Sequence, residues 1–173
     1  MEKRKILLFA GSNSSQSINR KIVEQAAGML NGHQTKLIDL RDFPLPLYSV
    51  DLEEQKGIPE PAQKLMEIFD EYNDFVVSVA EHNASVSTCF KNTMDWASRT
   101  QEDYRILKGK TVWLFSTSPA ESGGASALAH ARDIFSIFGA KIVNATAIGD
   151  FYGLNQEDIR SQLSQTLNSL LHA

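Results

Sequence analysis

Residues 5–19 read KILLFAGSNSSQSIN, an apolar run followed by one glycine and a stretch of small polar residues. The run Lys5–Ala10 shows no regular alternation of polar and apolar positions, which is typical of a strand buried on both faces of a parallel sheet. After the polar stretch, Ile18, Ile22 and Ala26 recur at helical spacing. A buried strand that passes through a polar loop into an amphipathic helix indicates an α/β fold.

The same alternation of apolar runs and amphipathic segments continues along the rest of the chain. Five strands joined by right-handed crossovers leave few topologies, and the flavodoxin-like strand order 2-1-3-4-5 suits this chain length. We therefore expect one domain over residues 1–173, a three-layer α/β sandwich around a five-stranded parallel sheet. The expected strands lie near residues 5–10, 35–40, 74–80, 111–116 and 141–147, and the expected helices near 17–30, 60–72, 88–98, 124–138 and after Asn155.

One segment, residues 42–61, interrupts this alternation. The prolines within Phe43–Tyr48 exclude a regular helix there, because proline lacks the backbone donor and restricts the residue before it. The segment is also too apolar to be a freely solvated linker. We therefore expect a functional or interface loop at this point of the chain.

Composition and charge exclude several classes of function. The chain has 173 residues, a formal net charge of −4 and a pI of about 5.6, which argues against an electrostatic nucleic-acid binder. No stretch approaches the ~18 apolar residues of a membrane span, and the apolar run after the basic start is too short for a signal peptide. Cys89 is the only cysteine, so an internal disulfide is impossible, and the four histidines lack metal-ligand spacing. These features favour a cytoplasmic protein without a metal or membrane site.

Ligands of such a fold bind outside the carboxyl ends of the strands, beside the first strand. The loop after that strand combines Gly11 with the hydroxyls of Ser12, Ser14 and Ser17 and the amide of Asn19. A helix N-terminus with such donors suits a monophosphate. The loop lacks the further glycines of GxGxxG, which admit a pyrophosphate, and the lysine of a P-loop. The same residues are also common in turns and helix caps, so the loop alone leaves both readings open.

Two separated motifs resemble the NADPH-dependent FMN reductase family, which includes bacterial quinone and chromate reductases. The family's Gly-Ser, four residues, Ser, one residue, Asn loop is matched within residues 11–19. Its Pro-Glu-Tyr-Asn and Leu-Lys-Asn-x-x-Asp-Trp motifs are matched in part within 80–83 and 90–96. Each motif alone is weak, but together they sit at the family's separation and on its elements, so the resemblance covers the whole domain.

The resemblance implies that FMN places its phosphate in the first loop and its pyrimidine edge against the backbone of 80–83. A third wall would come from 116–124, which corresponds to the family's Ser-Pro and Gly-Gly loop. The implied cofactor-binding residues are Gly11, Ser12, Ser14, Ser17, Ile18, Asn19, Ala80, Glu81, His82, Asn83, Ser116, Ser118, Pro119, Gly123 and Gly124.

The chain departs from the family's pattern at several positions. Ser14 stands where the family often has arginine, so one counter-charge to the phosphate is missing. Arg20 or Lys21 could supply part of it, although both are expected to be solvated charges on the helix. Ala80 replaces proline, and His82 replaces a tyrosine that packs near the flavin; stacking and plain exposure of this imidazole remain equally open. These changes bear on substrate preference more than on FMN binding.

The residues of the Lys-Asn-x-x-Asp-Trp stretch are expected to have structural roles. Lys91 and Asp95 lie at the spacing of a modest surface ion pair. Trp96 is expected in the core or an interface rather than against the cofactor, and Cys89 as a small buried residue rather than a nucleophile.

The resulting functional hypothesis is an FMN-dependent oxidoreductase that takes electrons from NADPH or NADH and reduces a small acceptor such as a quinone or a flavin by ping-pong kinetics. The cofactor carries the electron chemistry, so no catalytic side chain is required. The apolar loop at Phe43–Tyr48 suggests a homodimer, or a dimer of dimers, whose partner helps to cover the flavin. The alternative is a non-enzymatic flavodoxin-like electron carrier or redox-sensing module, although such carriers are typically much more acidic.

Overall fold

The computed structural model describes residues 3–172 and contains a five-stranded parallel sheet. Its strand order is β2-β1-β3-β6-β7, which confirms the flavodoxin-like order expected from the sequence. The strands are β1 (Lys5–Gly11), β2 (Gln34–Ile38), β3 (Asp74–Val79), β6 (Thr111–Thr117) and β7 (Lys141–Ile148).

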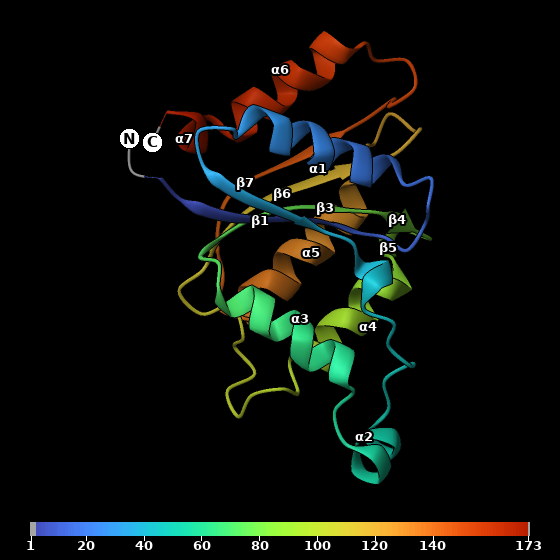
Figure 1. The fold of residues 1–173 in the computed structure, drawn as a ribbon. Helices are drawn as coiled ribbons and strands as arrows, with labels where there is room; N and C mark the ends of the chain where they lie inside the picture. Colours follow the sequence, from blue (N-terminus) through green and yellow to red (C-terminus); the bar gives the residue numbers. More distant parts are fainter. Residues whose placement is uncertain (1–2, 173) are drawn as a thin grey trace.

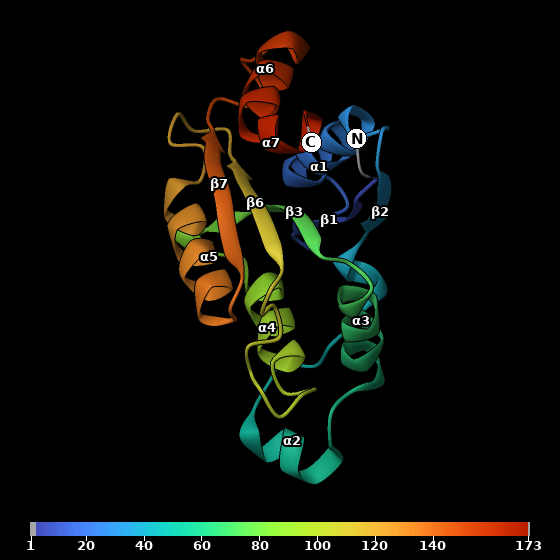
Figure 2. The same ribbon diagram turned by 90° about the vertical axis from the view of Figure 1, so that its left-hand side faces the viewer.

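Helices cover both faces of this sheet, so the molecule has three layers (Figure 1, Figure 2). The helices α1, α6 and α7 lie on one face, and α3, α4 and α5 lie on the other. Within the described residues, none of these helices has the length and apolar character that a membrane crossing needs. Their bounds are α1 Ile18–Met29, α3 Glu60–Asp70, α4 Thr88–Ala97, α5 Ala125–Ile137, α6 Gln156–Thr166 and α7 Asn168–Leu171.

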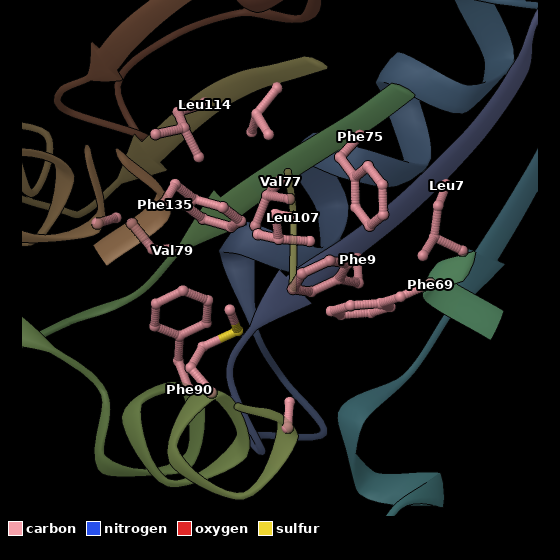
Figure 3. Close-up of a cluster of buried hydrophobic side chains, with 14 of the residues drawn as sticks. Leu7, Phe9, Phe69, Phe75, Val77, Val79, Phe90, Leu107, Leu114 and Phe135 are labelled. Carbon is pink, nitrogen blue, oxygen red and sulfur yellow. The ribbon is translucent and has the colours of Figure 1, made fainter. Parts of the chain in front are cut away.

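The central strand β1 contributes to the core on both of its faces. Leu7 and Phe9 point toward α3, α4 and α5, whereas Leu8 points toward α1 and α6, and all three side chains are fully buried. Phe69 of α3 stacks on Phe9 at 5.6 Å between ring centroids and meets Phe75 of β3 edge to face at 5.3 Å (Figure 3). This aromatic group fixes α3 against the middle of the sheet and makes the sheet a rigid base for the loops at its edge.

Two segments differ from the sequence-based expectation. The segment after β2 contains the short 3₁₀ helix η1 (Leu40–Asp42) and the helix α2 (Val50–Lys56), where only an irregular loop was expected. The segment after β3 folds into a hairpin of two short strands, β4 (Glu81–His82) and β5 (Ser85–Val86). The 3₁₀ helix and the two hairpin strands are too short to show a periodic pattern of apolar residues, and α2 buries no residue.

Candidate functional site

Three loops meet at the carboxyl edge of the sheet because the three central strands end in register. Gly11 at the end of β1 pairs with Val79 of β3, which pairs in turn with Ser116 of β6. The loops that follow these strands are therefore neighbours, as the topology requires. They are the three loops that the sequence analysis selected.

The first loop presents serine hydroxyls around the start of α1. Ser17 caps the helix, and its Oγ accepts a hydrogen bond from the backbone N–H of Arg20 at 3.2 Å. The Oγ atoms of Ser12 and Ser14 accept in the same way from the N–H groups two residues further on, each at 3.2 Å. A hydroxyl that accepts one bond can still donate its own proton. All three serines thus keep a donor that can serve an anion.

The N-terminus of α1 is open, whereas a carboxylate lies at the N-terminus of α5 and of α6, and the Ser87 side chain caps α4. The first turn of α1 has no acidic residue, and within residues 3–172 the N–H groups of Ile18 and Asn19 have no hydrogen-bond partner. In contrast, Glu81 accepts from an N–H in the first turn of α5, and Asp158 completes a capping box at the start of α6. Free N–H groups and the positive end of the helix dipole therefore favour an anion at α1.

Asn19 has a different role from the one expected of it. Its side chain is only 3% exposed and bonds inside the protein: Nδ2 donates to the carbonyl of Thr117 at 3.1 Å. Its Oδ1 accepts from the Ser78 hydroxyl at 2.7 Å and from the Thr117 N–H at 3.0 Å. The amide that was expected to face a phosphate is thus committed to strands β3 and β6, and Asn19 positions α1 against them.

Hydrogen bonds of Ser87 and Glu81 fix the second loop to its neighbours. The Ser87 hydroxyl donates to the carbonyl of Gly11 at 2.8 Å, and the Ser87 N–H donates to the carbonyl of Ala80 at 3.1 Å. Glu81 reaches the helix that follows the third loop, where its Oε2 accepts from the N–H of Ala127 in the first turn of α5 at 3.1 Å. Ala80 and Glu81 are therefore fixed in the protein, and the hairpin that follows carries the more exposed residues.

The tip of that hairpin is exposed and has a strained backbone. His82 and Asn83 are both exposed, and Asn83 and Ala84 have φ angles of +51° and +60°. An L-residue rarely adopts this left-handed conformation, and for alanine it costs about 1–2 kcal/mol. The two residues form the turn between β4 and β5, and a two-residue hairpin turn of this kind needs positive φ at both central positions.

The third loop needs its glycines for contacts within the protein. A Cβ on Gly123 would lie 2.7 Å from the backbone N of Gly149, and φ at Gly123 is +61°. A Cβ on Gly124 would lie 3.3 Å from the Cβ of Ser116, and φ there is +78°. These two glycines were expected because they allow a flat ring to approach closely. The structure adds a second reason, which is that a side chain at either position would crowd neighbouring atoms of the protein. The remaining expected residues of this loop are placed as follows: Ser116 is buried and donates to the Gly123 carbonyl, Ser118 donates to the Ala120 carbonyl, and Pro119 is exposed.

A groove of about 650 Å³ adjoins the hairpin tip. His82 and Asn83 line it together with residues of α4, α5 and the segment after β2, and none of its lining residues belongs to the first loop. The lining side chains are Leu47, Tyr48, His82, Asn83, Ser85, Val86, Thr88, Lys91, Asn92, Asp95, His130, Asp133 and Ile134. The groove is partly apolar and carries several hydrogen-bond donors.

The Lys-Asn-x-x-Asp-Trp stretch has the structural roles that were expected. Lys91 pairs with Asp95 at 2.5 Å on the surface of α4, and Trp96 is fully buried. Cys89 is half-buried, and burial raises the pKa of its thiol, so the thiol is protonated near neutral pH and is a poor nucleophile. Sequence analysis missed the partner of Asn92, which is the backbone of Pro46, 46 residues away.

The residues at this edge suit a phosphorylated planar ligand. Neutral donors that can bind a phosphate surround the open helix N-terminus, and the buried Gly124 leaves the third loop without a side chain beside Glu81. Arg20 does not add a free positive charge, because its guanidinium pairs with Glu24 and Asp39. An anion held in the first loop would therefore rely on hydroxyls and backbone dipoles.

Comparison with known proteins relates this arrangement to a family. The family model described as NADPH-dependent FMN reductase matches residues 4–152. The NAD(P)H-dependent FMN reductase PA1204 of Pseudomonas aeruginosa is 30% identical over 129 residues, which are 74% of this chain and 67% of that protein. A quinone reductase of Escherichia coli is 32% identical over 100 residues, which are 58% of this chain and only about half (52%) of that protein.

Among solved structures, the flavoenzyme NAD(P)H:acceptor oxidoreductase FerB of Paracoccus denitrificans has a TM-score of 0.71 with this chain. The two share 21% sequence identity, and the match covers 97% of this chain and 95% of FerB. At this identity the similarity shows a shared fold.

Proposed function

Because this chain belongs to the NADPH-dependent FMN reductase family, we propose that it binds FMN at the three-loop edge and uses NADPH or NADH to reduce a small acceptor such as a quinone. The observation that carries this proposal is the open N-terminus of α1 at the carboxyl edge of β1. It combines unpartnered N–H groups with three serine hydroxyls and no acidic residue.

The proposed binding mode assigns a part to each loop. Ser12, Ser14 and Ser17, with the N–H groups at the start of α1, would hold the phosphate. The backbone of residues 80–83 would face the pyrimidine edge of the ring, and residues 116–124 would form the third wall. FMN is favoured over FAD because the first loop has a single glycine, whereas a pyrophosphate needs closer backbone approach.

The chemistry needs no acid or base from the protein. FMN held at this edge would supply the two-electron chemistry between NAD(P)H and the acceptor. The three loops would orient the ring and leave one of its faces accessible to nicotinamide and acceptor in turn, so we expect ping-pong kinetics. The hydrogen bonds of Ser87 and Glu81 keep the second and third loops at fixed positions during both half-reactions.

A homodimer, or a dimer of dimers, is part of the proposal, and so is a cytoplasmic location. The segment after β2 supports the dimer because α2 buries no residue and its Val50 side chain is 57% exposed. Burial of this helix by a second copy would remove apolar surface from water. Analytical ultracentrifugation tests this part, and a monomer at all concentrations would contradict it.

Calorimetry and steady-state kinetics test the proposal as a whole. We expect one FMN per chain with a clear preference over FAD, and quinone-dependent oxidation of NADPH or NADH. Folded protein that binds no FMN would contradict the cofactor site. Protein that binds FMN without oxidising either nicotinamide would favour the electron-carrier alternative.

A further inference from the structure

The segment Phe43–Ser49, which we term the strap, is fastened to α4 by two side chains. Asn92 Nδ2 and Trp96 Nε1 both donate to the carbonyl of Pro46, at 3.0 Å and 2.7 Å. Asn92 Oδ1 accepts from the N–H of Tyr48 at 2.8 Å. Three hydrogen bonds thus fix the backbone on both sides of Leu47, and we term this arrangement the clasp.

Further contacts extend the clasp toward α2. The ring of Tyr48 meets Trp96 edge to face, with 5.0 Å between ring centroids. The Tyr48 hydroxyl donates to Glu53 of α2 at 3.0 Å, and Glu53 also pairs with Arg99 at 3.0 Å. Asn92 and Trp96 lie on one face of α4, since they are four residues apart, and Arg99 follows just after the C-terminal end of this helix. The strap is therefore held in one conformation, although α2 has no buried residue and lies beyond α3 and α4 (Figure 1, Figure 2).

The clasp holds Leu47 in an unusual place for a large apolar residue. The Leu47 side chain is 74% exposed, yet it lines the same groove as His82 and Asn83. On the other walls, Val86 and Ile134 also present apolar surface. Imidazole and amide groups at the hairpin end can donate to carbonyl oxygens. Such a groove suits a flat aromatic molecule with carbonyl groups at its edge.

We propose that Leu47 is a specificity-determining residue that selects for larger aromatic quinones, and that Asn92 is the positioning residue that holds Leu47 at the groove. This inference rests on the proposed function, because it places the acceptor beside the hairpin that would contact the flavin. A quinone with a second fused ring gains apolar contact with Leu47, whereas a single-ring quinone does not reach it.

The experiment compares 1,4-naphthoquinone with 1,4-benzoquinone as acceptors for FMN-loaded protein. Leu47→Ala should lower the naphthoquinone to benzoquinone ratio of kcat/KM by roughly fivefold, because the lost apolar contact acts only on the larger ring system. The affinity for FMN and the kcat with benzoquinone should stay unchanged. Lys64→Ala, on the exposed face of α3, is the matched control and should leave the ratio unchanged.

A double-mutant cycle separates the role of Asn92 from a general effect on stability. Asn92→Ala should lower the same ratio in the wild-type background but not in the Leu47→Ala background, since it acts through Leu47. It should also speed amide hydrogen exchange at Tyr48, which loses its acceptor. This second readout does not depend on activity.

Four outcomes would overturn the inference. An active Leu47→Ala variant with an unchanged ratio would exclude Leu47 as a determinant of specificity. Additive effects of the two substitutions, or unchanged exchange at Tyr48 in Asn92→Ala, would exclude the positioning role of Asn92. Wild-type protein that binds FMN but reduces neither quinone would instead overturn the proposed function, and this inference with it.

Discussion

The Ser17 side chain has two roles, because it caps α1 and its hydroxyl can donate to an anion in the first loop. Ser17→Ala should weaken FMN binding by roughly tenfold to a hundredfold, because a charge-assisted hydrogen bond contributes about 1.5–3 kcal/mol. Loss of the cap should lower the free energy of unfolding of the apoprotein by about 1 kcal/mol. Calorimetry and urea denaturation measure the two effects separately.

A carboxylate at the same position distinguishes a phosphate site from a simple helix cap. Ser17→Asp should bind FMN far more weakly than Ser17→Ala, because the carboxylate repels the phosphate, while the apoprotein should keep its stability since aspartate is a good cap. The matched control is Ser49→Asp at the cap of α2, which should leave FMN binding unchanged. If Ser17→Asp bound FMN as tightly as wild type, the phosphate would have to lie elsewhere.

Glu81 closes the N-terminus of α5 and thereby ties the second loop to the third. Glu81→Ala leaves the N–H of Ala127 without this acceptor and should lower the free energy of unfolding by about 1–2 kcal/mol, with weaker FMN binding. Glu81→Gln keeps an acceptor and should remain close to wild type in both measurements. Equal losses in the two variants would mean that the charge matters, rather than the hydrogen bond.

Asp39 connects three elements, since it follows β2, caps η1 and pairs with Arg20 of α1. The side-chain hydrogen bond from Arg41 lowers the pKa of its carboxyl group, and the charge of Arg20 adds to this effect. A carboxyl group with a lowered pKa in the folded state stabilises the protein above its unfolded pKa of about 3.9. This contribution is lost as the pH falls through the folded-state pKa.

Asp39→Asn should therefore destabilise the protein in a pH-dependent way. At pH 7 the free energy of unfolding should fall by about 1 kcal/mol, a small value because the Arg41 side chain is largely exposed. The difference from wild type should narrow progressively below about pH 4. Urea denaturation at pH 7 and pH 3 measures it, and an equal difference at both values would show that the ion pairs contribute nothing.

At the level of elements, sequence periodicity was sufficient for all the long helices and for the main sheet. It failed for α2, which buries no residue and therefore has no apolar stripe, although Ser49 followed by Asp51 and Glu53 is a helix-start signal. It also failed for the hairpin at 81–86, whose strands have two residues each. Neither α2 nor the hairpin has a periodic apolar pattern from which it could be predicted in a single sequence.

The site was predictable in part for a related reason. Topology alone brings the three loops together, so their positions followed from the strand order. The bonds of Asn19 with Ser78 and Thr117 join residues 59 and 98 positions apart, and the clasp joins α4 to Pro46. Such pairings arise from tertiary packing, and no local spacing indicates them. The family resemblance drew attention to Asn92 and Trp96 in the sequence. The structure explains why an amide and an indole suit these positions, since both side chains donate to the carbonyl of Pro46.

For the molecule as a whole, the central claim is that nicotinamide reduces FMN bound at the three-loop edge. Anaerobic stopped-flow mixing of FMN-loaded protein with NADPH or NADH tests this most directly. We expect the absorbance of oxidised flavin near 450 nm to be lost in a single phase, and to return when a quinone is added in a second mixing step. A flavin absorbance that neither nicotinamide changes would contradict the claim.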